Sequence, residues 1–253
     1  MKGVISTDLS GKVVLVTGGT TGVGRGIAEC FEAAGATIVV CARNAVDDLP
    51  AGWSFLAVDV RDGDAAWKMI DDVVSQHGSL DVLVNNAGGS PPADTSTASP
   101  RFTERIVALN LLSSIFTSQR ANHHMQQSGG GSIVNIGSVV ALRPSPTVAA
   151  YGAAKAGLLN FTITAGQEWA PKVRVNCVTA GAVRTDKSEM HYGDAEGIAR
   201  VEATIPMQRM ALPDDIGNAC VFLASESASY ITGANIVLHG GGDRPPFLDA
   251  AKK

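Results

Sequence analysis

Residues 17–26 read Thr17-Gly18-Gly19-Thr20-Thr21-Gly22-Val23-Gly24-Arg25-Gly26, between an apolar run and a helix-compatible stretch. Glycines at 18, 22 and 24 permit a tight turn, a close approach of the backbone to a pyrophosphate, and close packing of helix on strand. The helix that follows offers N–H donors to the anion. A nucleoside-triphosphate loop is excluded, because no lysine followed by a hydroxyl residue comes after the glycines. The stretch predicts a dinucleotide site at Gly18, Thr20, Thr21, Gly22, Val23 and Gly24, although a purely structural turn would also use glycine.

Outward from this loop, short β-branched runs alternate with longer amphipathic or alanine-rich stretches. This alternation is typical of repeated βαβ units on a parallel sheet. The expected strands are 13–17, 37–41, 54–58, 80–84, 132–136, 174–178 and 235–238. The expected helices are 23–34, 64–76, 102–127, 150–169 and 213–224. The sequence therefore predicts an α/β, doubly wound, Rossmann-type fold with a seven-stranded parallel sheet and helices on both faces.

Three segments interrupt the alternation. Residues 90–100 contain three prolines and predict an irregular loop. Residues 185–206 have weak periodicity between a strand and a helix, so we expect a lid there. Residues 240–248 are too rich in glycine and proline to continue the sheet. No linker divides the chain, and we expect one domain over residues 1–253 with the lid at about 185–206.

Composition excludes several classes of protein. The chain has 253 residues, 45% of them hydrophobic and 17% charged, which is enough to bury a large core. A net charge of −4 without Lys/Arg runs argues against nucleic acid and anionic membrane as partners. The start of the chain lacks the apolar core of a signal peptide, so we expect a cytoplasmic location. The cysteines and histidines show no metal-ligand spacing, and we expect no catalytic metal.

Motifs later in the chain indicate which kind of protein carries this glycine-rich loop. Asn85-Asn86-Ala87-Gly88 follows the fourth strand, Tyr151 and Lys155 have the spacing Y-x-x-x-K, and Ser138 lies thirteen residues before Tyr151. Together with Thr-Gly-x-x-x-Gly-x-Gly at 17–24 and Asn110, this ordered set resembles the short-chain dehydrogenase/reductase family. The resemblance runs from about residue 11 to residue 242. It implies catalytic residues at Asn110, Ser138, Tyr151 and Lys155.

Tyr151 and Lys155 lie four residues apart in an expected helix, so they share one face. A neighbouring ammonium, together with the positive nicotinamide of the oxidised complex, favours the phenolate, and we expect the two to lower the pKa of Tyr151. Tyr151 would exchange a proton with the substrate oxygen, and Ser138 would donate a hydrogen bond to that oxygen. The resemblance further implies that Lys155 holds the nicotinamide ribose and that Asn110 positions a water. Each residue taken singly also has a structural explanation, such as Asn110 bonding backbone.

The end of the second expected strand bears on the choice of coenzyme. It reads Cys41-Ala42-Arg43, with arginine beside the position where an acidic residue would bind a ribose 2′-hydroxyl. Arg43 therefore favours NADP(H), while NAD(H) stays possible. The resemblance implies that Asp59 and Val60 contact the adenine ring, although Asp59 could instead cap the next helix. It also assigns Asn86, Ala87 and Gly88 to the coenzyme site.

The stretch 176–185 is similar to the family's N-x-V-x-P-G-x-x-x-T, which packs against the nicotinamide through residues such as Val183 and Thr185. Ala180 stands where the family has proline, and we expect this loop to be less restricted as a result. His239 stands where the family often has aspartate, and a structural role is expected for it.

The residues thus predict an NADP(H)-dependent oxidoreductase that interconverts a ketone and a secondary alcohol, with a 3-oxoacyl thioester as one substrate class. The alternative substrate is a bulky alicyclic or steroid-like alcohol oxidised with NAD(H), since apolar lid residues could cover it or could only anchor the lid. A complete set of four argues against a nucleotide-sensing regulator without turnover. The resemblance implies a homotetramer formed through the long helices and the last strand.

Overall fold

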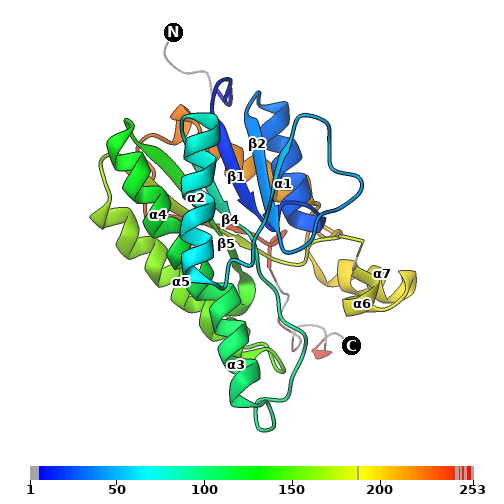
Figure 1. Cartoon of the computed structure of the whole chain (residues 1–253). Coiled ribbons are helices and arrows are strands. Elements are labelled where there is room, and N and C mark those ends of the chain that lie inside the picture. Colours follow the sequence, from blue (N-terminus) through cyan, green and yellow to red (C-terminus); the bar gives the residue numbers. More distant parts are fainter. Residues whose placement is uncertain (1–5, 187, 243–244, 246, 248–249, 252–253) are drawn as a thin grey trace.

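The computed structural model describes residues 6–186, 188–242, 245, 247, 250 and 251. Its centre is a seven-stranded sheet with the order β3-β2-β1-β4-β5-β6-β7 (Figure 1). Every strand pair is parallel. The order reverses between β1 and β4, and in open α/β sheets ligands bind beyond the carboxyl ends of the strands at such a point. The predicted fold class is confirmed.

The strands agree with the expected runs to within a few residues at each end. They are β1 Val13–Thr17, β2 Thr37–Ala42, β3 Ser54–Ala57, β4 Val82–Asn85, β5 Gly131–Ser138, β6 Val173–Ala180 and β7 Asn235–Leu238. Residues of β1 and β4 are all buried, as continuous apolar runs predict for a sheet covered on both faces. The longest strands, β5 and β6, extend together to Ser138 and Ala180, which pair in register.

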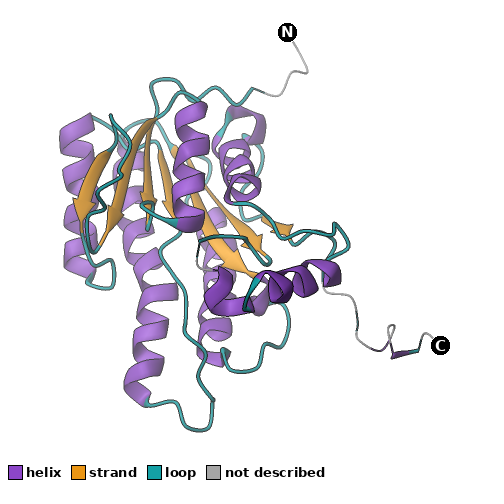
Figure 2. Cartoon of the chain, turned by 90° about the vertical axis from the view of Figure 1, so that its right-hand side faces the viewer, coloured by secondary structure: helices purple, strands orange, loops and turns teal. Residues whose placement is uncertain are grey.

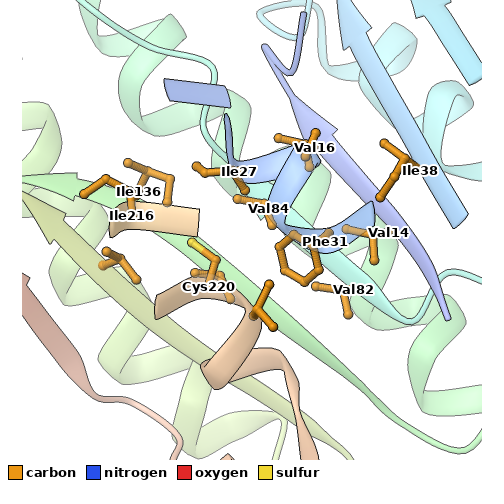
Figure 3. Close-up of a cluster of buried hydrophobic side chains, with 14 of the residues drawn as sticks. Val14, Val16, Ile27, Phe31, Ile38, Val82, Val84, Ile136, Ile216 and Cys220 are labelled. Carbon is orange, nitrogen blue, oxygen red and sulfur yellow. The ribbon is translucent and has the colours of Figure 1, made fainter. Parts of the chain in front are cut away.

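Two helical layers cover the sheet (Figure 2). On one face, α1 Gly22–Ala33 and α8 Pro213–Ala224 bury Ile27, Phe31 and Ile216 against alternate strand residues such as Val14 and Val16 (Figure 3). On the other face lie α2 Gly63–His77, α4 Ser113–Gln127 and α5 Ala149–Glu168, packed on the intervening residues of the same strands. Successive side chains of each strand point to opposite faces of the sheet, so the strands contribute to two separate hydrophobic cores.

The expected single helix over 102–127 is wrong in detail. The structure has α3 Pro100–Val107, then a π-helical turn Ala108–Leu112, and then α4. Ser99 caps α3 by accepting from the backbone N–H of Phe102, and Pro100 takes the first helical position. The π turn carries Asn110, which is fully buried. Such turns place an extra residue inside a helix and are frequent at functional sites.

The expected lid consists of two short helices, α6 Ser188–Tyr192 and α7 Ala195–Thr204, which project from the main body (Figure 1). They have a small core of their own, made by Ile198, Ile205 and Met210. Ile198 therefore anchors the segment, as one of the two sequence interpretations held. Met207 is exposed, and its backbone N–H donates to the carbonyl of Gly240. The side chains of Met190 and His191 lie outside what the structure describes, as do 243, 244, 246 and 248 of the tail.

Among the described residues, three of the four cysteines are buried and none forms a disulfide. In the same part of the chain, no helix combines the length and the apolar character that crossing a membrane requires.

Candidate active site

The phosphate loop is tied to the end of β4. The hydroxyl of Thr17 accepts hydrogen bonds from the backbone N–H groups of Asn86 and Ala87, both at 3.0 Å. In return, Nδ2 of Asn86 donates to the carbonyls of Thr17 at 2.9 Å and Gly18 at 3.2 Å. The loops that follow β1 and β4 are therefore joined at the point where the strand order reverses, and no motif in the sequence predicted this contact.

The loop is shaped so that only glycine fits at its tightest point. A Cβ atom at Gly24 would lie 2.2 Å from the carbonyl oxygen of Gly18 and 2.4 Å from Nδ2 of Asn86. Gly18 and Gly22 have φ angles of +64° and +55°, in the left-handed region. The result is a backbone cradle at the amino end of α1, whose first turn holds no acidic side chain. This cradle fits the pyrophosphate of a dinucleotide.

A cavity of about 640 Å³ extends from this cradle across the carboxyl ends of the strands. Its volume lies in the usual range for a ligand pocket. The structure brings every predicted coenzyme residue to its wall: Gly18, Thr20, Thr21, Gly22, Val23, Gly24, Arg43, Asp59, Val60, Asn86, Ala87, Gly88, Tyr151, Lys155, Val183 and Thr185. Ser138 also lines it, whereas Asn110 lies behind the wall. Arg61 and Asp186 line the cavity and were not predicted.

Three of the predicted catalytic residues meet at one end of the cavity. Ser138 ends β5, and its side chain lies close enough to Tyr151, in the first turn of α5, to influence the acidity of the phenol. Lys155 lies one turn further along α5, with Nζ 5.8 Å from the centroid of the Tyr151 ring. Its side chain is buried and donates to the carbonyl of Ile136 at 2.8 Å. The four-residue spacing thus places the phenol and the amine on one face, as predicted.

Burial dominates the acidities of these groups. It lowers the pKa of Lys155 from 10.5 to about 8, against a smaller opposing effect of Cys177. It also raises the pKa of Tyr151, while the hydrogen bond from Ser138 lowers it and the nearby phenol of Tyr192 raises it further. The net effect in the protein alone is a raised pKa of Tyr151, and the lowering expected from Lys155 together with the oxidised nicotinamide stays a prediction. The phenolate loses more stabilisation when it is removed from water than it gains from the neighbouring groups.

Asn110 holds the backbone of the adjoining loop. Its Oδ1 accepts from the N–H of Gly89 at 2.7 Å, and its Nδ2 donates to the carbonyls of Gly89 and Ile106, both at 2.9 Å. Both N–H donors of the amide are therefore used by backbone. These contacts match the structural alternative, and the water-positioning role that the resemblance implies stays a prediction. Gly88 lies between this amide and Lys155, since a Cβ there would be 2.7 Å from Oδ1 and 3.4 Å from Nζ.

The loop after β6 is well held despite Ala180. Gly181 donates to the carbonyl of Leu238 at 2.8 Å, Val183 bridges to Ala211, and Arg184 donates to the carbonyl of Ala211 at 2.8 Å. These contacts with β7 and with the segment before α8 hold the loop in place, while the expectation that Ala180 leaves it less restricted stays a prediction. His239 is exposed beside this loop.

At the opposite end of the cavity, the ends of β2 and β3 lie together. Arg43 is exposed there, and Asp59 accepts hydrogen bonds from Nε of Arg61 at 2.9 and 3.1 Å. Arg61, in first place, and Arg43 more weakly hold the pKa of Asp59 below its usual value, although burial opposes them. Asp62, not Asp59, caps α2 by accepting from Ala65 at 3.0 Å. The capping alternative for Asp59 is therefore wrong.

Comparison with known proteins agrees with this geometry. A family described as enoyl-(acyl carrier protein) reductase matches residues 18–242. The chain belongs to the short-chain dehydrogenase/reductase family. Membership makes this short-chain dehydrogenase/reductase an NAD(P)-dependent oxidoreductase that acts on alcohols and ketones.

Named relatives of this short-chain dehydrogenase/reductase span several substrates. The 2-dehydro-3-deoxy-D-gluconate 5-dehydrogenase of Escherichia coli strain K12 is 34% identical over 243 residues, covering 92% of this chain and 96% of that protein. The 3-oxoacyl-(acyl-carrier-protein) reductase of Chlamydia pneumoniae is 32% identical over 243 residues, covering 92% and 97%. The ligand-free structure of Thermoplasma acidophilum aldohexose dehydrogenase has a TM-score of 0.87 at 32% identity, covering 94% of this chain and 96% of that one.

Proposed function

We propose that this protein is an NADP(H)-dependent oxidoreductase that reduces a ketone, with a 3-oxoacyl thioester as the substrate class, and that the reverse oxidation uses the same residues. The observation that carries this function is the cavity that extends from the phosphate cradle to the side chains of Ser138 and Tyr151, both of which line it. A dinucleotide held on the cradle extends toward these hydroxyls, so that coenzyme and substrate meet at one end of the sheet.

The bound nicotinamide supplies the hydride in reduction and accepts it in oxidation. Tyr151 donates a proton to the carbonyl oxygen of the ketone as the hydride arrives, and in the reverse direction it takes the proton of the alcohol. Ser138 donates a hydrogen bond to the same oxygen and stabilises the charge that develops on it. Tyr151 is protonated at neutral pH, since the ordinary pKa of a phenol is 10.0 and burial raises that of Tyr151 further, so the protein alone is prepared for reduction.

Lys155 has two tasks in this proposal. Its buried amine binds the ribose beside the reactive ring, and with the oxidised nicotinamide bound it favours the phenolate of Tyr151, one turn away on α5. Asn110 contributes by fixing Gly89, and through it the loop that lines the cavity beside Lys155. Asn110 is thus a positioning residue for the coenzyme loop.

The preference for NADP(H) is supported by Arg43. A permanently charged, planar guanidinium beside Ala42 suits a ribose 2′-phosphate, and the acidic side chain that would favour a 2′-hydroxyl is missing from this position. Support for an acyl thioester comes from the Chlamydia pneumoniae relative, whose name gives that activity. Burial of Ile198 inside the α6–α7 segment weakens the alternative of a bulky alicyclic substrate, because this side chain is then not free to cover one.

A substrate panel tests the function. Purified protein is mixed with a 3-oxoacyl thioester, an open-chain ketone or an alicyclic ketone, each with NADPH and with NADH, and the absorbance of the reduced coenzyme is followed. We expect the highest kcat/KM for the thioester with NADPH. Higher kcat/KM for the alicyclic ketone with NADH would overturn both the proposed substrate and the proposed coenzyme.

The proposal extends to organisation. Residues 185–206 form a lid over the substrate, and the whole chain acts as one domain. The protein assembles as a homotetramer, and sedimentation of the purified protein tests this oligomeric state.

A further inference from the structure

Arg61 and Asp59 form an ion pair with several hydrogen bonds in the turn between β3 and α2. The backbone N–H of Arg61 donates to Oδ1 of Asp59 at 3.1 Å, and Nε donates to both carboxylate oxygens at 2.9 and 3.1 Å. Nη2 of Arg61 also donates to Oδ2. The carboxylate of Asp59 thus accepts hydrogen bonds from both the guanidinium group and the backbone N–H of Arg61. These bonds fix both side chains.

The pair lies where a coenzyme's adenosine end is expected. β2 and β3 are parallel neighbours, and the N–H of Val58 donates to the carbonyl of Ala42 at 3.0 Å. Asp59 and Arg43 therefore follow adjacent strand ends, and both line the cavity together with Arg61. The charge of Arg43 acts on Asp59, which shows that the three groups share one electrostatic environment.

We propose that Arg61 determines coenzyme specificity by neutralising Asp59, so that the carboxylate does not repel a ribose 2′-phosphate held by Arg43. This inference rests on the proposed preference for NADP(H). With Arg61 in place, the two arginines and one carboxylate give this corner a net positive charge. Without Arg61, the charges of Arg43 and Asp59 cancel, and the carboxylate is free to face the phosphate.

Arg61 acts in this account through Asp59, and not by direct contact with the phosphate. The two possibilities differ in one respect that can be measured. If Arg61 works by neutralisation, replacing Asp59 as well restores the phosphate preference that the loss of Arg61 removes. If Arg61 binds the phosphate itself, its loss persists whether or not Asp59 is charged. A purely structural role in the turn would weaken binding of every adenosine ligand equally.

The experiment measures two fragments of the coenzyme by isothermal titration calorimetry at low ionic strength. Adenosine 2′,5′-bisphosphate carries the 2′-phosphate, and adenosine 5′-monophosphate lacks it, so the ratio of their dissociation constants isolates the contribution of that phosphate. The proteins are the wild type, Arg61→Gln, Asp59→Asn and the double variant. Arg61→Lys, which keeps the charge, serves if Arg61→Gln does not fold, and it should keep most of the wild-type ratio.

We expect Arg61→Gln to reduce the preference for the bisphosphate by about threefold to tenfold, as one exposed like charge near a phosphate would. Asp59→Asn should increase the preference, and the double variant should return to at least the wild-type ratio. Arg120→Gln is the matched control, because Arg120 makes a comparable two-bond pair with Asp71 outside the cavity wall. It should leave the ratio unchanged.

An Arg61→Gln ratio equal to that of the wild type, or a double variant that stays as weak as Arg61→Gln, overturns the inference. A wild-type protein that binds both fragments equally overturns the coenzyme preference itself, and the inference with it. The two failures are therefore distinguishable in one set of titrations.

Discussion

Nζ of Lys155 lies 2.8 Å from the carbonyl oxygen of Ile136, and the hydrogen bond it donates joins α5 to β5. Ser138 lies two residues further along the same strand. The amine of one predicted catalytic residue is therefore fixed by the strand that carries another, and Tyr151 lies between them in the first turn of α5. Rigid elements of secondary structure thus hold all three groups, which is how precise sites are built.

Replacing Tyr151 with phenylalanine removes the proton donor without changing the shape of the ring. We expect kcat for ketone reduction to fall by at least about a hundredfold, which is typical for loss of a general acid, and the dissociation constant for NADPH to change less than about twofold. Fluorescence titration and steady-state rates measure the two quantities. Tyr230→Phe is the control, since Tyr230 is fully exposed. Substantial turnover by Tyr151→Phe would remove Tyr151 from the mechanism.

The buried amine of Lys155 makes stability depend on pH in a defined direction. The folded protein releases this proton near pH 8 and the unfolded chain near 10.5, so between these values the unfolded chain binds more protons and stability rises with pH. Relative to Lys155→Met, the wild type should therefore gain on the order of 2 kcal/mol in unfolding free energy between pH 7 and pH 10.

Urea denaturation at several pH values checks this difference. Lys172→Met is the matched control, because Lys172 also donates to a backbone carbonyl, that of Gln126 at 2.7 Å, but is exposed. Lys172→Met shows how much of any change follows from the loss of an exposed lysine. A difference for Lys155→Met that does not vary with pH would show that burial leaves the pKa of Lys155 unchanged.

Gly24→Ala tests the cradle. The added methyl would lie 2.2 Å from the carbonyl oxygen of Gly18, so the loop must shift away from its bond with Asn86. We expect the dissociation constant for NADPH to rise by about tenfold or more, because the backbone donors lose their alignment. Gly63→Ala is the control: it lies in the first turn of α2, where a methyl meets Phe116 at an ordinary 3.4 Å. Equal coenzyme affinity in both variants would argue against a fitted cradle.

Asn110→Ala tests whether Asn110 serves to hold the backbone of the adjoining loop or to take part in proton transfer. The variant leaves both polar groups of Gly89 and the carbonyl of Ile106 without this partner, and we expect a loss of about 2 to 4 kcal/mol in unfolding free energy. Asn110→Asp keeps the acceptor but loses both donors, so it should be destabilised as well. Thermal denaturation measures both. A variant that is as stable as the wild type but slow in turnover would assign Asn110 to proton transfer instead.

Local patterns were sufficient for much of the fold and for the candidate site. Gly18, Gly22 and Gly24 after an apolar strand, and the spacing of Tyr151 and Lys155, depend only on neighbouring residues, and the structure brings all of them to one cavity. Arg61 was missed because its pairing with Asp59 depends on the geometry of a turn. The π turn at Asn110 was missed because its residues are compatible with an ordinary helix.

Acidity was the property least accessible from sequence. The rise in the pKa of Tyr151 comes first from burial, which depends on every element packed around α5, and only then from neighbours such as Ser138 and Tyr192. The restraint on the loop after Ala180 likewise comes from Ala211, a residue distant in the chain. Spacing shows which groups can meet, whereas packing decides how much water they retain.

The α6–α7 segment has its own apolar centre at Ile198, Ile205 and Met210, apart from the two cores that flank the sheet. Mutations can therefore accumulate in this flap during evolution without disturbing the strands that bear the reactive groups. If residues 185–206 form the proposed lid, a scaffold divided in this way lets the contacts to substrate change while the strands beneath keep their packing.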